Sequence, residues 1–121
     1  MGQLDVVQDV DGGAVVVCVR GEVDSNTVDQ LVSALDDGLQ ASASAPVRTL
    51  VIELANVTYF GSAGLNAVLG CYERGLAEGV AVRVVATNPE VVRPIEVTKL
   101  DAVLRPYPSV ADALAADAGP P

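Results

Sequence analysis

Short runs of β type alternate with helical stripes along this chain, and this alternation is the feature that most limits what it can fold into. The β-type runs cover residues 4–9, 14–20, 47–54 and 80–86. Two helical stripes between them have the same i, i+3, i+4, i+7, i+11 spacing. Their members are Val28, Leu31, Val32, Leu35 and Leu39 in the first, and Leu65, Val68, Leu69, Tyr72 and Leu76 in the second. Strands that alternate with helices in this way predict an α/β domain.

The first two runs predict a β-hairpin, because the turn sequence Asp-Gly-Gly at residues 11–13 separates them. The second run is almost continuously apolar, which is typical of a central strand covered on both faces. A hairpin followed by alternating units predicts a mixed sheet of four to five strands with an antiparallel edge strand, flanked by about four helices. In the last two runs, alternate residues share one face of the sheet: Leu50, Ile52, Leu54, Val80, Val82, Val84 and Ala86.

The helix ends carry several cap signals. Thr27 with Gln30 could form a capping box at the first helix, and Ser25 or Asn26 could cap it instead. Asn88-Pro89 predicts the start of a third helix, with the asparagine as N-cap. Ser109 with Asp112 predicts the cap of a last short helix, and residues 103–104 (Val-Leu) could form a short edge strand.

The length of 121 residues predicts a single domain over residues 1–121. We expect its folded core to span about residues 4–114, with residues 115–121 as a flexible tail. A chain of this length can bury roughly two thirds of its unfolded surface, so it needs neither a disulfide nor a metal for stability.

The sequence contains no histidine, which excludes histidine general bases, Ser-His-Asp and Cys-His nucleophilic sites, and histidine metal ligands. Cys18 and Cys71 are the only thiols and cannot form a zinc cluster; we expect both to be small buried hydrophobic residues. The sequence also lacks a Walker lysine motif and a G-x-G-x-x-G run. We therefore predict that the protein is not an enzyme and has no catalytic residue, metal or cofactor.

The net charge of the chain indicates which classes of partner it can bind. The chain has 7 basic and 16 acidic residues, a net charge of −9, which argues against binding to nucleic acid or to an anionic membrane. No run has the length of a transmembrane helix, and the N-terminus does not resemble a signal peptide. We expect a soluble cytoplasmic protein.

Ligands and partners of open α/β sheets tend to meet the carboxyl ends of the strands. Here those ends are residues 21–27 and 56–64, both rich in small polar residues. If the second and third strands are neighbours, Asp24 and Ser62 lie on one edge of the molecule; Asp24 could be a cap or part of a partner surface. The candidate partner-binding residues are Glu22, Asp24, Ser25, Asn26, Thr27, Gly61, Ser62, Ala63, Gly64, Leu65 and Asn66.

Ser62 stands where a helix should begin and has two interpretations. It could be a plain N-cap, with its hydroxyl accepting a backbone N–H. It could instead be a phosphorylation site, because a helix N-terminus stabilises added negative charge, and Gly61 and Gly64 leave space for another protein to approach. A nucleophile elbow needs glycine two residues before and after the serine; Gly64 satisfies this and Phe60 does not.

Two motifs carry a resemblance to a known family. Gly-Glu-Val-Asp at residues 21–24 follows a buried strand, and Phe-Gly-Ser-Ala-Gly-Leu at residues 60–65 opens a helix. Together they resemble the STAS domain, and in particular its stand-alone bacterial anti-sigma factor antagonists. The resemblance extends from about Leu4 to Leu114. The sequence departs from the usual pattern at Gly61, where the family often has Asp, and at Ala63, where it often has Ser or Thr.

The resemblance implies a partner-switching role for a monomer or a weak homodimer. The unphosphorylated antagonist would bind an anti-sigma factor kinase and free a sigma factor. Phosphorylation of the serine that maps onto Ser62 would dissociate the complex, and a PP2C-type phosphatase would restore the binding form. By the same motif match, the strand-end aspartate of the family maps onto Asp24.

Two alternatives stay open. A STAS-like chain could be a subunit or sensor domain of a transport or stress-signalling complex. An enzyme would need a base other than histidine, with Asp24 or Glu22 as candidates.

Overall fold

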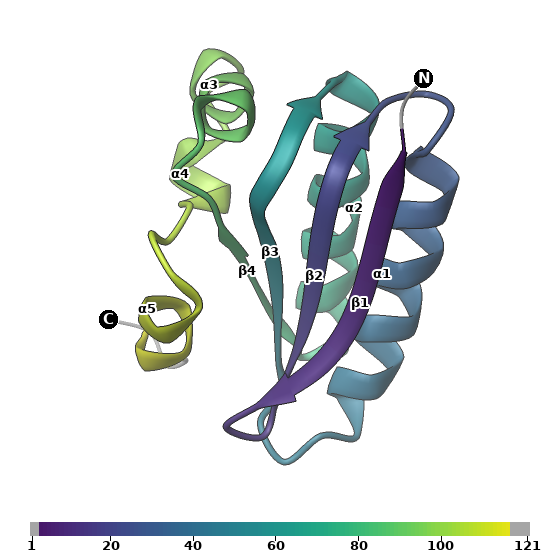
Figure 1. Ribbon diagram of the computed structural model, residues 1–121. Coiled ribbons are helices and arrows are strands. Elements are labelled where there is room, and N and C mark those ends of the chain that lie inside the picture. The colour runs from purple at the N-terminus through teal and green to yellow at the C-terminus, as the bar shows by residue number, and fades with distance from the viewer. Residues whose placement is uncertain (1–2, 117–121) are drawn as a thin grey trace.

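The computed structural model describes residues 3–116, which form one sheet with helices on both faces (Figure 1). The strands are β1 (Leu4–Asp11), β2 (Ala14–Val23), β3 (Thr49–Phe60) and β4 (Ala81–Val85). The helices are α1 (Val28–Ala43), α2 (Ser62–Glu78), α3 (Pro89–Val97), α4 (Asp101–Leu104) and α5 (Val110–Ala115). No helix within this described part is long and apolar enough to cross a membrane.

The sheet has the strand order β1-β2-β3-β4. β1 pairs antiparallel with β2, and the pairs β2–β3 and β3–β4 are parallel. The predicted mixed sheet with an antiparallel edge strand is therefore confirmed. The described residues hold five helices where about four were expected.

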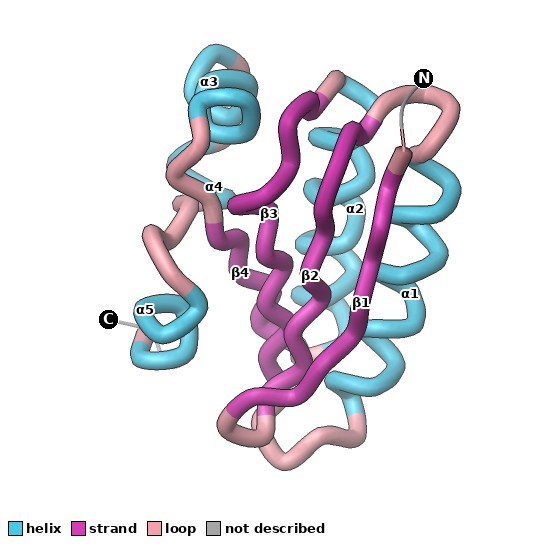
Figure 2. The backbone as a smooth tube through the Cα atoms, viewed as in Figure 1, coloured by secondary structure: helices cyan, strands magenta, loops and turns pink. Residues whose placement is uncertain are grey.

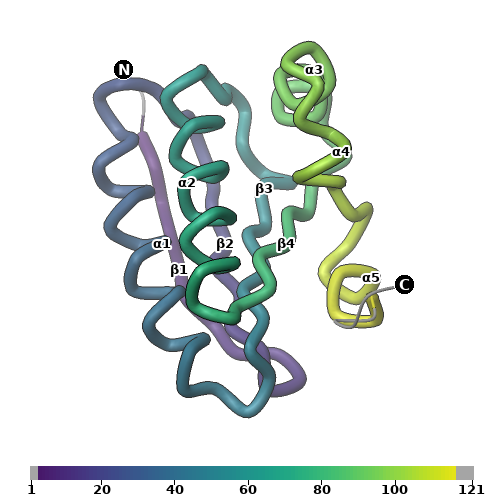
Figure 3. The backbone as a smooth tube through the Cα atoms, turned by 180° about the vertical axis from the view of Figure 1, so that it is seen from behind, coloured from purple at the N-terminus to yellow at the C-terminus, as the bar shows by residue number. Residues whose placement is uncertain are grey.

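Helices α1 and α2 lie side by side on one face of the sheet, as the view from behind shows (Figure 3). Leu31, Leu35 and Leu39 of the predicted first stripe are buried against the sheet. The residues predicted to share one face in the runs 47–54 and 80–86 are buried too: Leu50, Ile52, Leu54, Val80, Val82, Val84 and Ala86. Burial of these aliphatic side chains between helix and sheet is the main source of stability here.

The prediction that the second apolar stripe extends to Leu76 is wrong. Leu76 is 64% exposed, and the helix instead turns Cys71 and Gly75 to the sheet. A Cβ at Gly75 would lie 2.6 Å from Cγ2 of Val82, so α2 approaches the sheet too closely for a larger residue there. Because α2 lies so close to the sheet, its small residues make the contact with the sheet.

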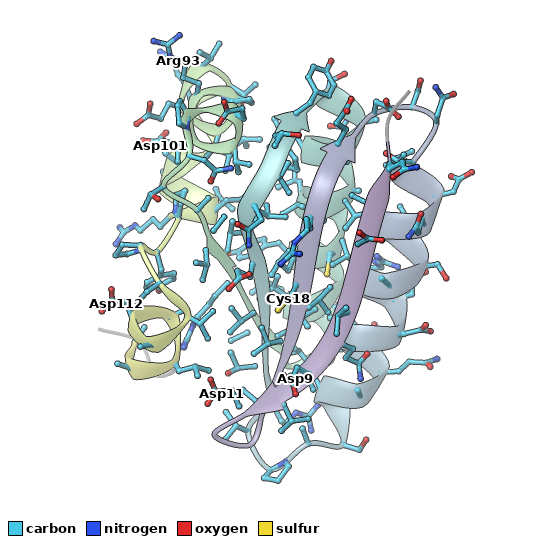
Figure 4. The ribbon with its side chains drawn as sticks, in the orientation of Figure 1. Asp9, Asp11, Cys18, Arg93, Asp101 and Asp112 are labelled. Carbon is cyan, nitrogen blue, oxygen red and sulfur yellow. The ribbon has the colours of Figure 1, made fainter. Side chains whose placement is uncertain are left out.

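The opposite face is only partly covered. Short helix α5 packs on the β3–β4 side, where Val16, Val51, Val85 and Ala113 form a small second core. Cys18 is only half-buried on this face and Arg20 is exposed, so the expected covering of both faces of β2 holds for its first part alone (Figure 4). Both cysteines were expected to be buried, and only Cys71 is.

Several boundaries differ from expectation, and those at β3, at residues 103–104 and at the tail are the largest. β3 runs on to Phe60, through most of the predicted loop, because its backbone keeps pairing with β2 as far as Val23. Residues 103–104 belong to α4 and are not a strand; Leu104 N donates to Leu100 O as in a helix. The bridge to β4 is made by Tyr107 instead. Of the predicted tail, residue 115 still belongs to α5, and residues 117–121 lie outside the described residues.

Asn88 is the N-cap of α3 by position, as predicted, but its side chain does not cap the helix. Its Nδ2 donates to the carbonyl oxygens of Leu54 (3.1 Å) and Val57 (2.7 Å) in β3. These bonds span the stretch of β3 where its register with β2 shifts. Asn88 therefore ties α3 to the part of β3 that leads to Ser62.

We expect Asn88→Ala to lower the free energy of unfolding by about 2 kcal/mol, because two strand carbonyls lose their donor. Urea unfolding followed by circular dichroism measures the change. Asn66→Ala, at an exposed position on α2, is the matched control and should stay within about 0.5 kcal/mol of the wild type. Equal unfolding midpoints for the two variants would show that the Asn88 bonds contribute nothing.

Candidate functional site

The ends of β2 and β3 lie side by side and bring both predicted loops to one edge (Figure 2). Val23 pairs with Phe60 at the last rung of the parallel ladder. The next residue, Gly61, donates its N–H to Val23 O at 3.0 Å. Asp24 and Ser62 follow these paired residues directly, so both lie on one edge, as expected from neighbouring strands.

The loop from β2 to α1 is held by its own side chains. Asp24 Oδ1 accepts from the backbone N–H groups of Asn26 (2.8 Å) and Thr27 (3.1 Å). Thr27 Oγ1 accepts from Asp24 N (3.0 Å) and donates to Glu22 O (2.8 Å). The N-cap of α1 is Thr27 and not Asp24, whose carboxylate instead orders the loop. A role of Asp24 in a partner surface stays a prediction.

The capping box expected at Thr27 and Gln30 is wrong. Thr27 is the N-cap by position, but its side chain makes no cap hydrogen bond. Gln30 Nε2 donates to Leu4 O at 2.8 Å instead. The side chain that would have closed the box thus fastens α1 to the start of β1.

Ser62 is exposed and is the first residue of α2, while Gly61 is the N-cap. The N-cap interpretation of Ser62 is therefore wrong, because the bond from Gly61 to Val23 O places the helix boundary one residue earlier. The first helical hydrogen bond runs from Leu65 N to Gly61 O at 3.1 Å. The amides of residues 62–64 precede that bond, and such first-turn N–H groups stabilise negative charge.

Gly64 does not provide space for a partner, contrary to expectation. It is buried, and a Cβ there would lie 2.6 Å from Cγ1 of Val23 and 3.0 Å from Cε1 of Phe60. The beginning of α2 rests directly on the ends of β2 and β3, which requires glycine. Leu65 is buried as well and anchors the helix to the core.

The predicted partner-binding residues thus fall into three groups by exposure. Ser25, Asn26, Ser62 and Asn66 are exposed; Glu22, Asp24, Gly61 and Ala63 are half-buried; Thr27, Gly64 and Leu65 are buried. The first group can touch a partner, while the buried group positions the edge.

Tyr59 is a residue of this edge that the sequence reasoning missed. Its side chain is 53% exposed, and its ring lies over Gly61. A Cβ at Gly61 would lie 3.1 Å from Oη, 3.2 Å from Cε2 and 3.4 Å from Cζ of the tyrosine. The signal in the sequence was the scarcity of aromatic residues, since one of only three tyrosines stands directly before the second motif.

The edge carries no positive charge of its own. Residues 21–30 and 56–69 contain neither Lys nor Arg, but they include Glu22, Asp24 and Asp29. A phosphate on Ser62 would find no cation in these two segments and would depend on the first-turn amides of α2.

Nothing at the two cysteines suggests nucleophilic chemistry. Burial raises the pKa of the Cys71 thiol to about 12. Burial, together with the nearby carboxylates of Glu53 and Asp9, raises the pKa of Cys18. Both thiols are therefore protonated at neutral pH, and the thiolate is the nucleophilic form.

A hollow of about 500 Å³ is lined by residues of β1, β2, β3 and α1. Asp5, Cys18 and Glu53 are among its lining residues, and Ser62 is not. Gln30 and Asn56, which belong to the two segments of the edge, line it as well.

This chain is similar to known proteins over most of its length. The family model described as the STAS domain matches residues 5–113. The chain is 28% identical over 102 residues to the anti-sigma F factor antagonist of Paenibacillus polymyxa, covering 84% of this chain and 85% of that protein. It is 31% identical over 102 residues to the anti-sigma-F factor antagonist RsfB of Mycobacterium tuberculosis, covering 84% and 80%.

Among solved structures, an anti-sigma factor antagonist from Mycobacterium paratuberculosis superposes with a TM-score of 0.83 at 34% identity, covering 93% of this chain and 92% of that one. The unphosphorylated form of the anti-sigma factor antagonist SpoIIAA superposes with a TM-score of 0.70 at 18% identity, covering 91% and 93%. At that identity, the second similarity concerns the fold alone.

Proposed function

Because this chain belongs to the STAS domain family, we propose that it acts as an anti-sigma factor antagonist. In this role it binds an anti-sigma factor of the serine-kinase type through the edge formed by the ends of β2 and β3. Binding frees a sigma factor, and phosphorylation of Ser62 ends the binding. The chain is then a regulatory binding protein and not an enzyme, because the kinase supplies the catalysis.

The observation that carries this proposal is the position of Ser62. Its side chain is exposed, it does not cap α2, and it stands beside the end of β2. A kinase can therefore reach the hydroxyl without unfolding the domain. The first-turn amides and the positive end of the α2 dipole would stabilise the added phosphate in the free protein.

The same edge explains why a phosphate would weaken the complex. Its two loop segments contain no Lys or Arg that could pair with the dianion. A partner that covers Ser62 would have to desolvate the phosphate without a compensating cation from these two segments, which costs several kcal/mol. The switch is then a local change in charge and requires no rearrangement of the fold.

Within this role, a PP2C-type phosphatase would restore the binding form by removing the phosphate. Sigma factors act on transcription, so the role places the protein in the cytoplasm. No cofactor takes part on this side of the complex, and a monomer or a weak homodimer is sufficient for it.

Phosphate transfer to Ser62 tests the proposal directly. The protein is mixed with a kinase-type anti-sigma factor from the same genome, ATP and Mg²⁺, and the modified residue is mapped by mass spectrometry. We expect one phosphoryl group on the wild type and none on Ser62→Ala. Ser25→Ala, which removes another exposed serine of the same edge, should be labelled like the wild type. Equal labelling of Ser62→Ala would show that the site is assigned wrongly.

A further inference from the structure

Tyr59 is an exposed aromatic side chain in a protein that has few aromatic residues. The sequence has three tyrosines, one phenylalanine and no tryptophan. Phe60 is buried, and Tyr72 and Tyr107 are half-buried, which leaves Tyr59 as the one aromatic side chain that is exposed. Alternation along β3 turns Phe60 into the core and Tyr59 outward. An exposed tyrosine beside a partner edge is notable because tyrosine is enriched among residues that dominate interface energies.

The ring of Tyr59 lies in the space that the absent side chain of Gly61 leaves open. Gly61 has φ −82° and ψ 179°, an extended conformation that any residue adopts, so the backbone does not require glycine here. A Cβ at position 61 would lie 3.1 to 3.4 Å from three ring and hydroxyl atoms of Tyr59. Those distances are tighter than ordinary contacts, so a side chain at position 61 would make the ring shift by a few tenths of an ångström.

The position of the ring ties it to the switch residue. Gly61 immediately precedes Ser62, so a ring that lies over Gly61 adjoins the peptide that leads into the serine. A protein that covers Ser62 must also meet this ring. The ring brings apolar area and a hydroxyl that can donate and accept a hydrogen bond, on an edge whose two loops contain no cation.

We propose that Tyr59 is a specificity-determining contact for the anti-sigma factor and that Gly61 is its positioning residue. The inference rests on the proposed function. It adds to that function the prediction that the partner contacts both Ser62 and the ring of Tyr59. A side chain at position 61 would crowd the ring and shift the apolar area that it offers to the partner.

A double-mutant cycle tests the pair, with affinities for the anti-sigma factor measured by calorimetry. We expect Tyr59→Ala to weaken binding about 30-fold, the loss typical of an interface hot spot. Gly61→Ala should weaken it about tenfold in the wild type and less than twofold in the Tyr59→Ala background, since residues that act through one contact are not additive. Tyr59→Phe, which keeps the ring over Gly61, should bind within about fivefold of the wild type.

Two controls separate recognition from folding. Leu76→Ala removes another exposed large side chain, fourteen residues further along α2 and about 21 Å from Ser62, and should leave the affinity unchanged. All variants should unfold within a few degrees of the wild type, since Tyr59 is largely exposed. Specificity is read against a second kinase-type anti-sigma factor from the same genome: Tyr59→Ala should reduce the preference for the first about tenfold.

The outcomes distinguish the two proposals. If the wild type binds the anti-sigma factor and Tyr59→Ala binds equally well, the inference about Tyr59 is wrong while the proposed function stands. Additive losses for Tyr59→Ala and Gly61→Ala, or a Tyr59→Phe loss as large as that of Tyr59→Ala, would refute the positioned ring. If the wild type neither binds any kinase-type anti-sigma factor of its genome nor is phosphorylated at Ser62, both proposals fail.

Discussion

Full phosphorylation of Ser62 is expected to weaken binding to the kinase-type anti-sigma factor about a thousandfold. Ser62 lies on an edge whose two loop segments contain no Lys or Arg, so a partner would cover the dianion without a cation from either segment. A penalty of about 4 kcal/mol for that desolvation corresponds to the thousandfold change. Ser62→Asp carries one charge in place of nearly two, and we expect it to lose about 30-fold.

Calorimetric titration of the phosphorylated protein, Ser62→Asp and Ser62→Ala against the anti-sigma factor measures the effect. Ser62→Ala should bind like the unphosphorylated wild type, because the hydroxyl does not cap α2. Ser25→Asp adds the same charge at another exposed residue of the edge and should cost less than Ser62→Asp. If Ser62→Asp binds as tightly as Ser62→Ala, charge at this position is not the switch.

Gly21→Ala is expected to be the most destabilising small substitution in the first motif. Gly21 has φ +112°, a conformation that residues with a side chain rarely adopt. A Cβ there would also lie well inside the contact distance of the Gln3 carbonyl oxygen, a backbone atom that already accepts the N–H of Glu22. Backbone strain and overpacking together should cost about 4 kcal/mol, or roughly 15 °C in the melting temperature.

Gly12→Ala is the matched control for this substitution. Gly12 also has a positive φ, of +59°, but no atom lies within 4 Å of the position its Cβ would take. Gly12→Ala should lower the free energy of unfolding only by the cost of the left-handed backbone conformation, about 1 kcal/mol. The difference between the melting temperatures of the two variants then measures the contribution of the clash with Gln3. If the two variants melt at the same temperature, β1 does not pack on Gly21 as described.

Much of the fold follows from periodicity that can be read along the chain. The apolar spacing of α1 predicted its buried leucines, and the alternation of residues 80–86 predicted the buried face at β4. These patterns are reliable because a helix or strand repeats its own geometry, so the spacing alone decides which residues share a face. The same patterns placed residues 21–27 and the segment around Ser62 at strand ends, and the strand order of the sheet makes those two ends neighbours.

The errors concern contacts between distant parts of the chain. Ser62 looked like an N-cap, but the bond from Gly61 to Val23 moved the boundary. Leu76 completed a helical stripe, but the close approach of Gly75 to Val82 turned it to solvent. Asn88 looked like a cap, and its side chain reaches Leu54 and Val57 instead. The spacing of residues along the chain does not reveal these contacts.

The sequence by itself determined the α/β class, the family motifs and the serine at which a switch could act, because motifs and periodicity are properties of consecutive residues. Only the tertiary structure decided that the Ser62 hydroxyl is exposed and not used as a cap, that Asp24 orders its own loop, and that Tyr59 lies over Gly61. Those outcomes depend on strand pairing, close backbone approach and side-chain packing, which bring together residues that the sequence keeps apart.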